Sequence, residues 1–334
     1  MFEAEPTGRG IAIGRNLQME VQPMALADRT PPSEAEYADY RKRFSNWGRW
    51  GADDELGTLN FVSDEVRRKA AALVQSGRAI SCTRPIDTKA GPANPYPAHH
   101  FVAVGQSGGM LDYMGLFIHG ITNTHIDALC HLATTDGQTY NGGTLKGNHM
   151  PDGKRGTIEH WKDGIVTRGV LYDVPRLRGS DYVEPGKPVH GWELQDCAAA
   201  QAIQPAAGDA VLIRSGLDPY FEMTGTTQGF GSPAGVHASC IEFLHETQAS
   251  CLIWDFQDAP IADQGIPNPM PGPMALHVHH ILLPYMGMPI IDNADFEALA
   301  KACAELGRWE FQLVVAPLLL EGGTGSPVNP IAIL

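Results

Sequence analysis

A short run from Thr124 to His131 most constrains what this chain can fold into. It reads T-H-I-D-A-L-C-H and brings three potential metal ligands together, His125, Asp127 and His131. If the first half is extended, His125 and Asp127 share one face, because side chains alternate along a strand. If the second half turns helical, His131 comes beside Asp127, because residues four apart lie on one face of a helix. The fold must therefore let three polar side chains converge here.

The ligand types in this run indicate which ions it can bind. Imidazole nitrogen combined with carboxylate oxygen suits zinc, manganese or iron better than calcium or magnesium, which prefer oxygen ligands alone. The run therefore predicts a divalent metal site. The alternative is a buried hydrogen bond between His125 and Asp127, with His131 as a core residue and no metal.

The same stretch resembles the signature of the cyclase/kynurenine formamidase family of metal-dependent hydrolases, H-x-G-T-H-x-D-x-P-x-H. The matching residues are Thr124, His125, Asp127, Ala128 and His131. Three positions depart from the pattern: Ile121 stands in place of the first His, Asn123 in place of Gly and Leu129 in place of Pro. The loss at Ile121 matters most, because an aliphatic side chain cannot bind a metal. Either the nearby His119 compensates, or the site holds one metal with more water, or its metal differs.

Further segments resemble the longer members of this family and extend the likeness over most of the chain beyond residue 40. They are Asn46–Asn60, Tyr140–Gly142, Gly164–Leu171 and Gly323–Ile333. The resemblance implies an α/β protein with the swivelling β/β/α fold of the kynurenine formamidase-like proteins. It also implies a divalent cofactor, Zn or Mn, bound as one or two ions.

Composition limits the class of partner. The 334 residues are 43% hydrophobic, which is enough for a sizeable core, and the net charge is −14. This charge argues against nucleic acid and anionic membranes as partners, so a small-molecule substrate is expected. The six cysteines are scattered without C-x-x-C pairs, which favours reduced, buried thiols in a cytoplasmic protein. No stretch has the length of a membrane span or the pattern of a signal peptide.

The pattern of apolar residues predicts one catalytic domain over residues 35–334. Residues 1–34 show no sustained period and are expected to be a flexible extension, or an arm on a neighbouring subunit of a homo-oligomer. Helical periodicity marks the segments Ser33–Phe44, Asp64–Ser76, His190–Ala200, Ala238–Thr247 and Asp295–Leu306. Short β-rich runs mark the segments Ala79–Thr83, Phe101–Val104, Leu116–His119, Gly169–Val174, Ala210–Ser215, Cys251–Trp254 and Gln312–Pro317.

A second histidine cluster, L-H-V-H-H, ends at His280. An extended segment would put His277 and His279 on one face, whereas a helix would bring His277 near His280. The family resemblance places a His about twelve residues before an acidic ligand, and His280 with Asp292 keeps that spacing. His279 is the alternative, and a histidine cluster without any metal is the simpler explanation.

The resemblance assigns roles to these residues. It implies that His125 and Asp127 hold the metal, that Asp127 can bridge to a second ion, and that His280 with Asp292 completes the second position. His131 is the candidate general acid/base, because imidazole titrates near neutral pH, although it could also be a further ligand.

Two aromatic residues are candidates for substrate binding. Trp50, in a glycine-rich stretch, could form a wall against a flat substrate, and Tyr140 could donate a hydrogen bond to a substrate oxygen. The structural alternatives are a core anchor for the Trp and a turn at Asn141-Gly142 that explains the Tyr140 segment without function.

Together the motifs predict a metal-dependent hydrolase that uses activated water to cleave an amide, a cyclic imide or a lactone of a small cyclic or aromatic substrate. A metal-dependent cyclase or lyase, in which His131 moves protons without adding water, is the first alternative. A small-molecule-binding protein without catalysis is the second.

Overall fold

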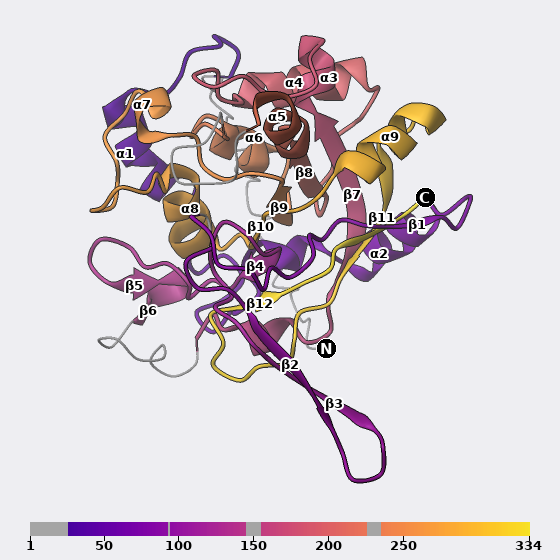
Figure 1. The fold of residues 1–334 in the computed structure, drawn as a ribbon. Coiled ribbons are helices and arrows are strands. Elements are labelled where there is room, and N and C mark those ends of the chain that lie inside the picture. Colours follow the sequence, from indigo (N-terminus) through magenta and orange to yellow (C-terminus); the bar gives the residue numbers. More distant parts are fainter. Residues whose placement is uncertain (1–25, 93, 145–154, 226–234) are drawn as a thin grey trace, which may run out of the picture.

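The computed structural model describes residues 26–92, 94–144, 155–225 and 235–334 (Figure 1). Within these residues the central sheet has nine strands in the order β1-β13-β11-β7-β8-β9-β10-β4-β12. Their bounds are β1 Ala79–Ser81, β4 His125–Asp127, β7 Ile165–Asp173, β8 Ala210–Arg214, β9 Cys251–Trp254, β10 Ile290–Asp292, β11 Glu310–Val315, β12 Gly325–Pro327 and β13 Ile331–Ile333. The α/β class predicted from the sequence is confirmed.

The middle of the sheet is parallel and its ends are antiparallel. Strands β7, β8, β9 and β10 run parallel to one another, whereas β7 pairs antiparallel with β11, and β4 pairs antiparallel with both β10 and β12. In this register His125 of β4 lies opposite Asp292 of β10. Residues directly opposite each other in an antiparallel pair share one face, so the sheet brings these two side chains together.

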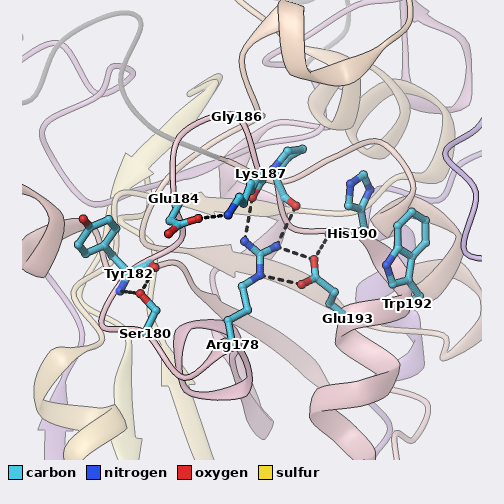
Figure 2. A pocket seen from close by; sticks show the side chains of 10 residues that line it. Arg178, Ser180, Tyr182, Glu184, Gly186, Lys187, His190, Trp192 and Glu193 are labelled. Carbon is cyan, nitrogen blue, oxygen red and sulfur yellow. Dashed lines mark hydrogen bonds and ion pairs between the residues drawn. The ribbon is translucent and has the colours of Figure 1, made fainter.

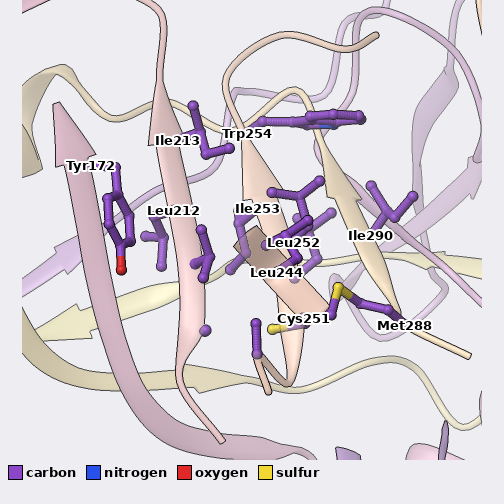
Figure 3. Packing of buried hydrophobic residues seen from close by; sticks show 14 of the residues in the cluster. Tyr172, Leu212, Ile213, Leu244, Cys251, Leu252, Ile253, Trp254, Met288 and Ile290 are labelled. Carbon is purple, nitrogen blue, oxygen red and sulfur yellow. The ribbon is translucent and has the colours of Figure 1, made fainter. Parts of the chain in front are cut away.

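The parallel strands β8 and β9 are built from unbroken apolar runs. Every residue of both strands is buried, which is the pattern expected when a strand is covered on both faces. Figure 3 shows how the large side chains of this region, including Tyr172, Leu212, Ile253 and Trp254, fill the space around the strands. The close packing gives the neighbouring β10 and β4 a rigid support.

The α-helices cover this sheet and are mostly short. Their bounds are α1 Glu34–Arg43, α2 Asp64–Ala71, α3 Val174–Arg178, α4 Gly191–Ala200, α5 Leu217–Thr224, α6 Cys240–Glu246, α7 Ile261–Gln264, α8 His277–Ile281 and α9 Glu297–Leu306. Single turns of other helix types occur at Gly57–Phe61, Tyr140–Gly142, Ile158–Trp161 and Leu282–Met286. Helix α2 packs against β7 and β11, and α4 packs against β7 and α6. No helix of the described ranges is both long and apolar enough to cross a membrane.

Two small hairpins lie outside the central sheet. Strands β5 Gln138–Thr139 and β6 Gly143–Thr144 form one of them. Strands β2 His99–Val104 and β3 Met110–Gly115 form the other, which projects from the body of the molecule (Figure 1).

The predicted elements agree with this fold with one clear exception. A helix is present in each of the five predicted helical segments, and strands occur in all predicted β-rich runs except Leu116–His119. That prediction is wrong, because β3 ends at Gly115 and residues 116–120 leave the sheet as irregular chain. Residues 1–25 of the predicted extension lie outside the described residues. Leu26, which belongs to the same predicted extension, is buried, and a Cβ atom added at Gly191 of α4 would lie 2.6 Å from its Cδ2.

Candidate metal centre

The β4 strand places two of the predicted ligands on one face of the sheet. His125 and Asp127 are both buried, as is Asp292 on the neighbouring strand. Nε2 of His125 lies 3.5 Å from Oδ1 of Asp127 and 3.7 Å from Oδ2 of Asp292. The alternation predicted for the H-x-D segment therefore exists, and Ile126 between the two ligands points into the core.

Two further imidazoles come from the loops on either side of β4. Nδ1 of His119 lies 2.8 Å from Oδ1 of Asp127, and Nε2 of His131 lies 3.8 Å from Oδ2 of the same carboxylate. The two rings stack with their centroids 3.6 Å apart. His131 reaches this place through a turn rather than a helix, since its amide donates to the carbonyl of Ala128. His119 thus places an imidazole directly beside Asp127.

The second histidine cluster contributes His279, which corrects the preference for His280. Nε2 of His279 lies 3.6 Å from Oδ2 of Asp127 and 3.4 Å from Oδ2 of Asp292. Because the segment is helical in α8, His280 points elsewhere and packs edge-on against Tyr285. Neither ring nitrogen of His280 has a hydrogen-bond partner within the described part of the chain. Asp292 lies where the sequence resemblance implied, but it is paired with the preceding histidine.

These residues fit a divalent cation. Ligand atoms of His119, Asp127 and His131 form one group, and those of His125, Asp127 and Asp292 form another, each within 4.8 Å. Oδ2 of Asp127 is buried and has no hydrogen-bond partner among the described residues. A buried carboxylate oxygen without a partner is costly, and a bound cation would offset that cost. Because Asp127 belongs to both groups of ligand atoms, the arrangement can hold one ion or two ions.

Hydrogen bonds behind the centre hold its side chains in place. Nδ1 of His125 donates to the carbonyl of Asn123 at 2.9 Å, which leaves Nε2 free to bind a metal. The indole N–H of Trp254 donates to Oδ1 of Asp292. Oγ1 of Thr324 lies 3.0 Å from Nε2 of His119. Trp254 and Thr324 were not predicted, because their partners are far away in the sequence.

A glycine allows β12 to approach the centre. Gly325 lies opposite Asp127 in the β4–β12 pair. A Cβ atom at this position would lie 2.6 Å from the carbonyl oxygen of Ile126 and 2.7 Å from Cε1 of His119. Any larger residue would push His119 or the strand away. The G-T-G segment near the end of the chain therefore shapes the wall of the site.

The titratable side chains of the centre shift one another's pKa values. Burial raises the pKa of Asp127, but His131, His119 and His125 outweigh it and hold that pKa well below its usual range. Burial lowers the pKa of His131 to about 4, so its ring is neutral at pH 7. For His279 burial is outweighed by Asp292 and Asp258, which raise its pKa.

A cavity of about 220 Å³ adjoins the centre. His119 lines it, together with Tyr96, Phe117, Ile118 and Ile121. The rings of Tyr96 and Phe117 lie 5.2 Å apart at a tilt of 54° and are exposed. The open side of the metal centre therefore has an apolar, aromatic wall.

The two predicted substrate-binding residues do not line this cavity. Trp50 packs edge-on against Phe61, and the guanidinium of Arg49 lies over its ring. Tyr140 is buried, and its hydroxyl donates to Oδ2 of Asp54 at 3.0 Å. Trp50 is half-buried and packs within the Asn46–Asn60 segment, whereas Tyr140 begins the turn between β5 and β6 that its structural alternative expected.

A larger cavity, of about 640 Å³, lies beside α3 and α4 (Figure 2). Its charged side chains are paired with one another: Arg178 with Glu193 and Lys187 with Glu184. None of the predicted site residues lines it. We therefore place the candidate site at the Asp127 cluster.

The chain is similar to known proteins in sequence and in structure. The model of a family described as putative cyclase matches residues 68–259. The crystal structure of a novel cyclase has a TM-score of 0.75 and 28% sequence identity, over 88% of this chain and 99% of its own. An isatin hydrolase bound to the product analogue thioisatinate has a TM-score of 0.52 and 16% identity, over 79% of this chain and 94% of its own.

A third similar structure is isatin hydrolase A from Labrenzia aggregata bound to benzyl benzoate. It has a TM-score of 0.51 and 15% identity, over 79% of this chain and 94% of its own. No curated protein sequence matches the chain. The family model covers more than half of the chain, and the resemblance seen in the sequence is thereby confirmed: this protein belongs to the cyclase family.

Proposed function

We propose that this protein is a metal-dependent hydrolase that cleaves an amide, a cyclic imide or a lactone of a small cyclic or aromatic substrate. The observation that carries the proposal is the unpartnered Oδ2 of Asp127, which is buried among imidazoles beside an open cavity. A carboxylate oxygen in such a place is suited to a divalent cation, for which Zn and Mn are the candidates.

Five side chains would hold the cation or cations. They are His119, His125, Asp127, His279 and Asp292. A bound divalent ion supplies positive charge that lowers the pKa of a water molecule and polarises a carbonyl group. The protein side chains fix the position of that charge against the sheet, and the buried surroundings strengthen its effect.

His131 would move the proton. Its ring is neutral at pH 7 because burial lowers its pKa to about 4, so it can accept a proton. Its side chain keeps 28% of its surface open to solvent, and its Nε2 lies 3.8 Å from Oδ2 of Asp127. From this place it would take a proton from water and pass it to the leaving nitrogen or oxygen.

The cavity supports a compact, flat substrate. Tyr96 and Phe117 offer aromatic surfaces, and Ile118 and Ile121 add apolar wall. Aromatic side chains bind flat rings by stacking or edge-on contact. The fold shared with two isatin hydrolases makes isatin, a cyclic amide, a reasonable member of a test panel.

A metal-dependent cyclase or lyase is the second candidate. The family description as putative cyclase and the similar structure of a novel cyclase favour it. In this case His131 would transfer a proton within the substrate, and no water would be added.

Turnover in oxygen-18 water separates the candidates. The full chain, loaded with Zn or Mn, is incubated with formamides, cyclic imides including isatin, and lactones. Hydrolysis requires the label in the product acid, whereas a cyclase or lyase forms unlabelled product. The Asp127→Asn variant is the blank for metal-independent hydrolysis. Unlabelled products, or no product from any class with a fully loaded centre, would contradict the proposed hydrolase.

A further inference from the structure

The turn that carries His131 rests on a segment that is distant in the sequence. The backbone N–H of Cys130, the residue before His131, donates to the carbonyl of Gly156 at 3.0 Å. Gly156 has a φ of 65°, and a Cβ atom at this position would lie 3.2 Å from Cβ of Leu129. A left-handed backbone in such close contact favours glycine. The position of the imidazole at residue 131 therefore depends on where Gly156 is held.

Glu55 holds Gly156 in this place. Its Oε2 accepts the backbone N–H of Gly156. Its Oε1 lies 3.4 Å from Nε of Arg155, and only 20% of its side chain is exposed. Its backbone carbonyl accepts the indole N–H of Trp161 at 3.3 Å. A carboxylate forms stronger hydrogen bonds to backbone N–H groups than a neutral acceptor does, so Glu55 fixes the backbone on which the turn of His131 rests.

The segment held by this carboxylate also reaches the second imidazole of the stacked pair. The backbone N–H of Ile158 donates to the carbonyl of Gly323 at 2.9 Å. The next residue, Thr324, accepts the N–H of Ala128 at 3.0 Å through its carbonyl. Its hydroxyl lies 3.0 Å from Nε2 of His119. One junction of three chain segments thus supports both stacked rings.

Glu55 acts at a distance from the cation and the substrate. In the described chain it belongs to neither group of candidate metal ligands, and it does not line the cavity beside the centre. We propose that Glu55 is a positioning residue, which fixes Gly156 and thereby holds the ring of His131 against His119 in the position for proton transfer. The part that concerns proton transfer rests on the proposed function, whereas the fixing of the turn does not.

The thiol of Cys130 reports on this turn without a substrate. Cys130 is buried, as are the other five cysteines of the chain. We expect Glu55→Ala to raise the rate at which a maleimide labels Cys130 about tenfold, because a lost hydrogen bond to a charged group lets the turn open more often. Peptide mass spectrometry should find the other five cysteines labelled at the wild-type rate. Unchanged labelling of Cys130, or equal acceleration at all six cysteines, would overturn the proposal.

Two further variants make the labelling specific. Glu55→Gln keeps an oxygen that can accept the N–H of Gly156, so its Cys130 should label at nearly the wild-type rate. Glu193→Ala is the matched control, because Glu193 also accepts a backbone N–H and pairs with an arginine, Arg178, while 15% of its side chain is exposed (Figure 2). This control should leave the labelling of Cys130 unchanged. A Glu55→Gln variant that labels as fast as Glu55→Ala would show that the hydrogen bond to Gly156 does not hold the turn.

Kinetics and metal content test the effect on the reaction. With a substrate that the wild type hydrolyses, we expect Glu55→Ala to lower kcat about 10–100-fold, the usual effect of losing a supporting partner. Its KM and metal content should stay near the wild-type values, and Glu55→Gln should recover most of the rate. A wild-type kcat in Glu55→Ala, or metal loss in parallel with the rate, would overturn the role in proton transfer. If the wild type hydrolyses nothing, the proposed function fails, and the labelling of Cys130 still decides whether Glu55 holds the turn.

Discussion

Oδ2 of Asp258 lies 2.5 Å from Nδ1 of His279 and accepts a hydrogen bond from it, so that Nε2 of the same ring faces Asp127 and Asp292. Oδ1 of Asp258 also accepts the backbone N–H of Val278. One carboxylate thus fixes both the first turn of α8 and the tautomer of the histidine. Such a partner behind a metal-binding histidine orients the ring and raises its basicity.

The two neighbouring histidines of α8 should therefore behave differently. His279→Ala should lose most of its metal, because the variant lacks a ring that faces both carboxylates. His280→Ala should keep its metal but lose on the order of 1–3 kcal/mol of unfolding free energy, since its ring fills a buried space. Elemental analysis and urea unfolding of both variants make the comparison. Equal metal loss in the two variants would show that α8 does not present His279 alone to the metal.

His119 should act as a ligand in place of the residue missing at Ile121. We expect His119→Ala to lose metal during dialysis against a mild chelator about as fully as His125→Ala. The reason is that Nδ1 of His119 lies 2.8 Å from Oδ1 of Asp127, the same oxygen from which Nε2 of His125 lies 3.5 Å. A His119→Ala variant with wild-type retention would show that the ring only packs against His131.

His131→Gln should separate proton transfer from metal binding. A general acid/base supplies about 10²–10⁴-fold in rate, so we expect a loss of that size with nearly wild-type metal content. Single-turnover rates and elemental analysis on the same sample provide the measurement. If metal and rate fall in parallel, His131 is a ligand together with His119, as their stacked rings also permit.

A buried histidine outside the centre should make stability depend on pH. Burial and the neighbouring His190 lower the pKa of His237 from 6.5 to about 4. Its Nε2 donates to the carbonyl of Gln264, and its Nδ1 accepts the N–H of Ser239. The unfolded chain binds this proton more readily, so His237 stabilises the fold fully above pH 6.5, and that stabilisation is lost as the pH falls toward 4.

The His237→Gln variant tests this dependence. It should lose on the order of 1–3 kcal/mol of unfolding free energy at pH 7, because the buried hydrogen bonds are disturbed. The further loss between pH 7 and pH 5 should be smaller than in the wild type. Urea unfolding at the two pH values measures both quantities, and an equal pH-dependent loss would show that other groups set the acid sensitivity.

Local patterns were sufficient to predict part of this centre. The alternation of the H-x-D segment placed His125 and Asp127 on one face, because that property depends only on adjacent residues. The helical spacing of α8 separates His279 from His277 and His280 in the same way. Sequence alone could not decide which of the two faces meets the site, since that depends on how α8 packs.

Such local patterns could not predict contacts between residues that are distant in the sequence. Asp258 holds His279, and Thr324 lies beside His119, through pairings that depend on the order of strands in the sheet. The short strand β10 was not predicted, although it aligns Asp292 with His125. Trp50 and Tyr140 were plausible by residue type alone, but their partners are Phe61 and Asp54.

The metal content of the wild type beside Asp127→Asn tests the central claim most directly. Asparagine keeps the size of the side chain and removes the charge that both ligand groups share. The exposed Asp64→Asn variant is the matched control. We predict one or two equivalents of Zn or Mn in the wild type and the control, and loss of most of it in Asp127→Asn, with all three folded by circular dichroism. Equal metal content in Asp127→Asn and the wild type would contradict a centre built around Asp127.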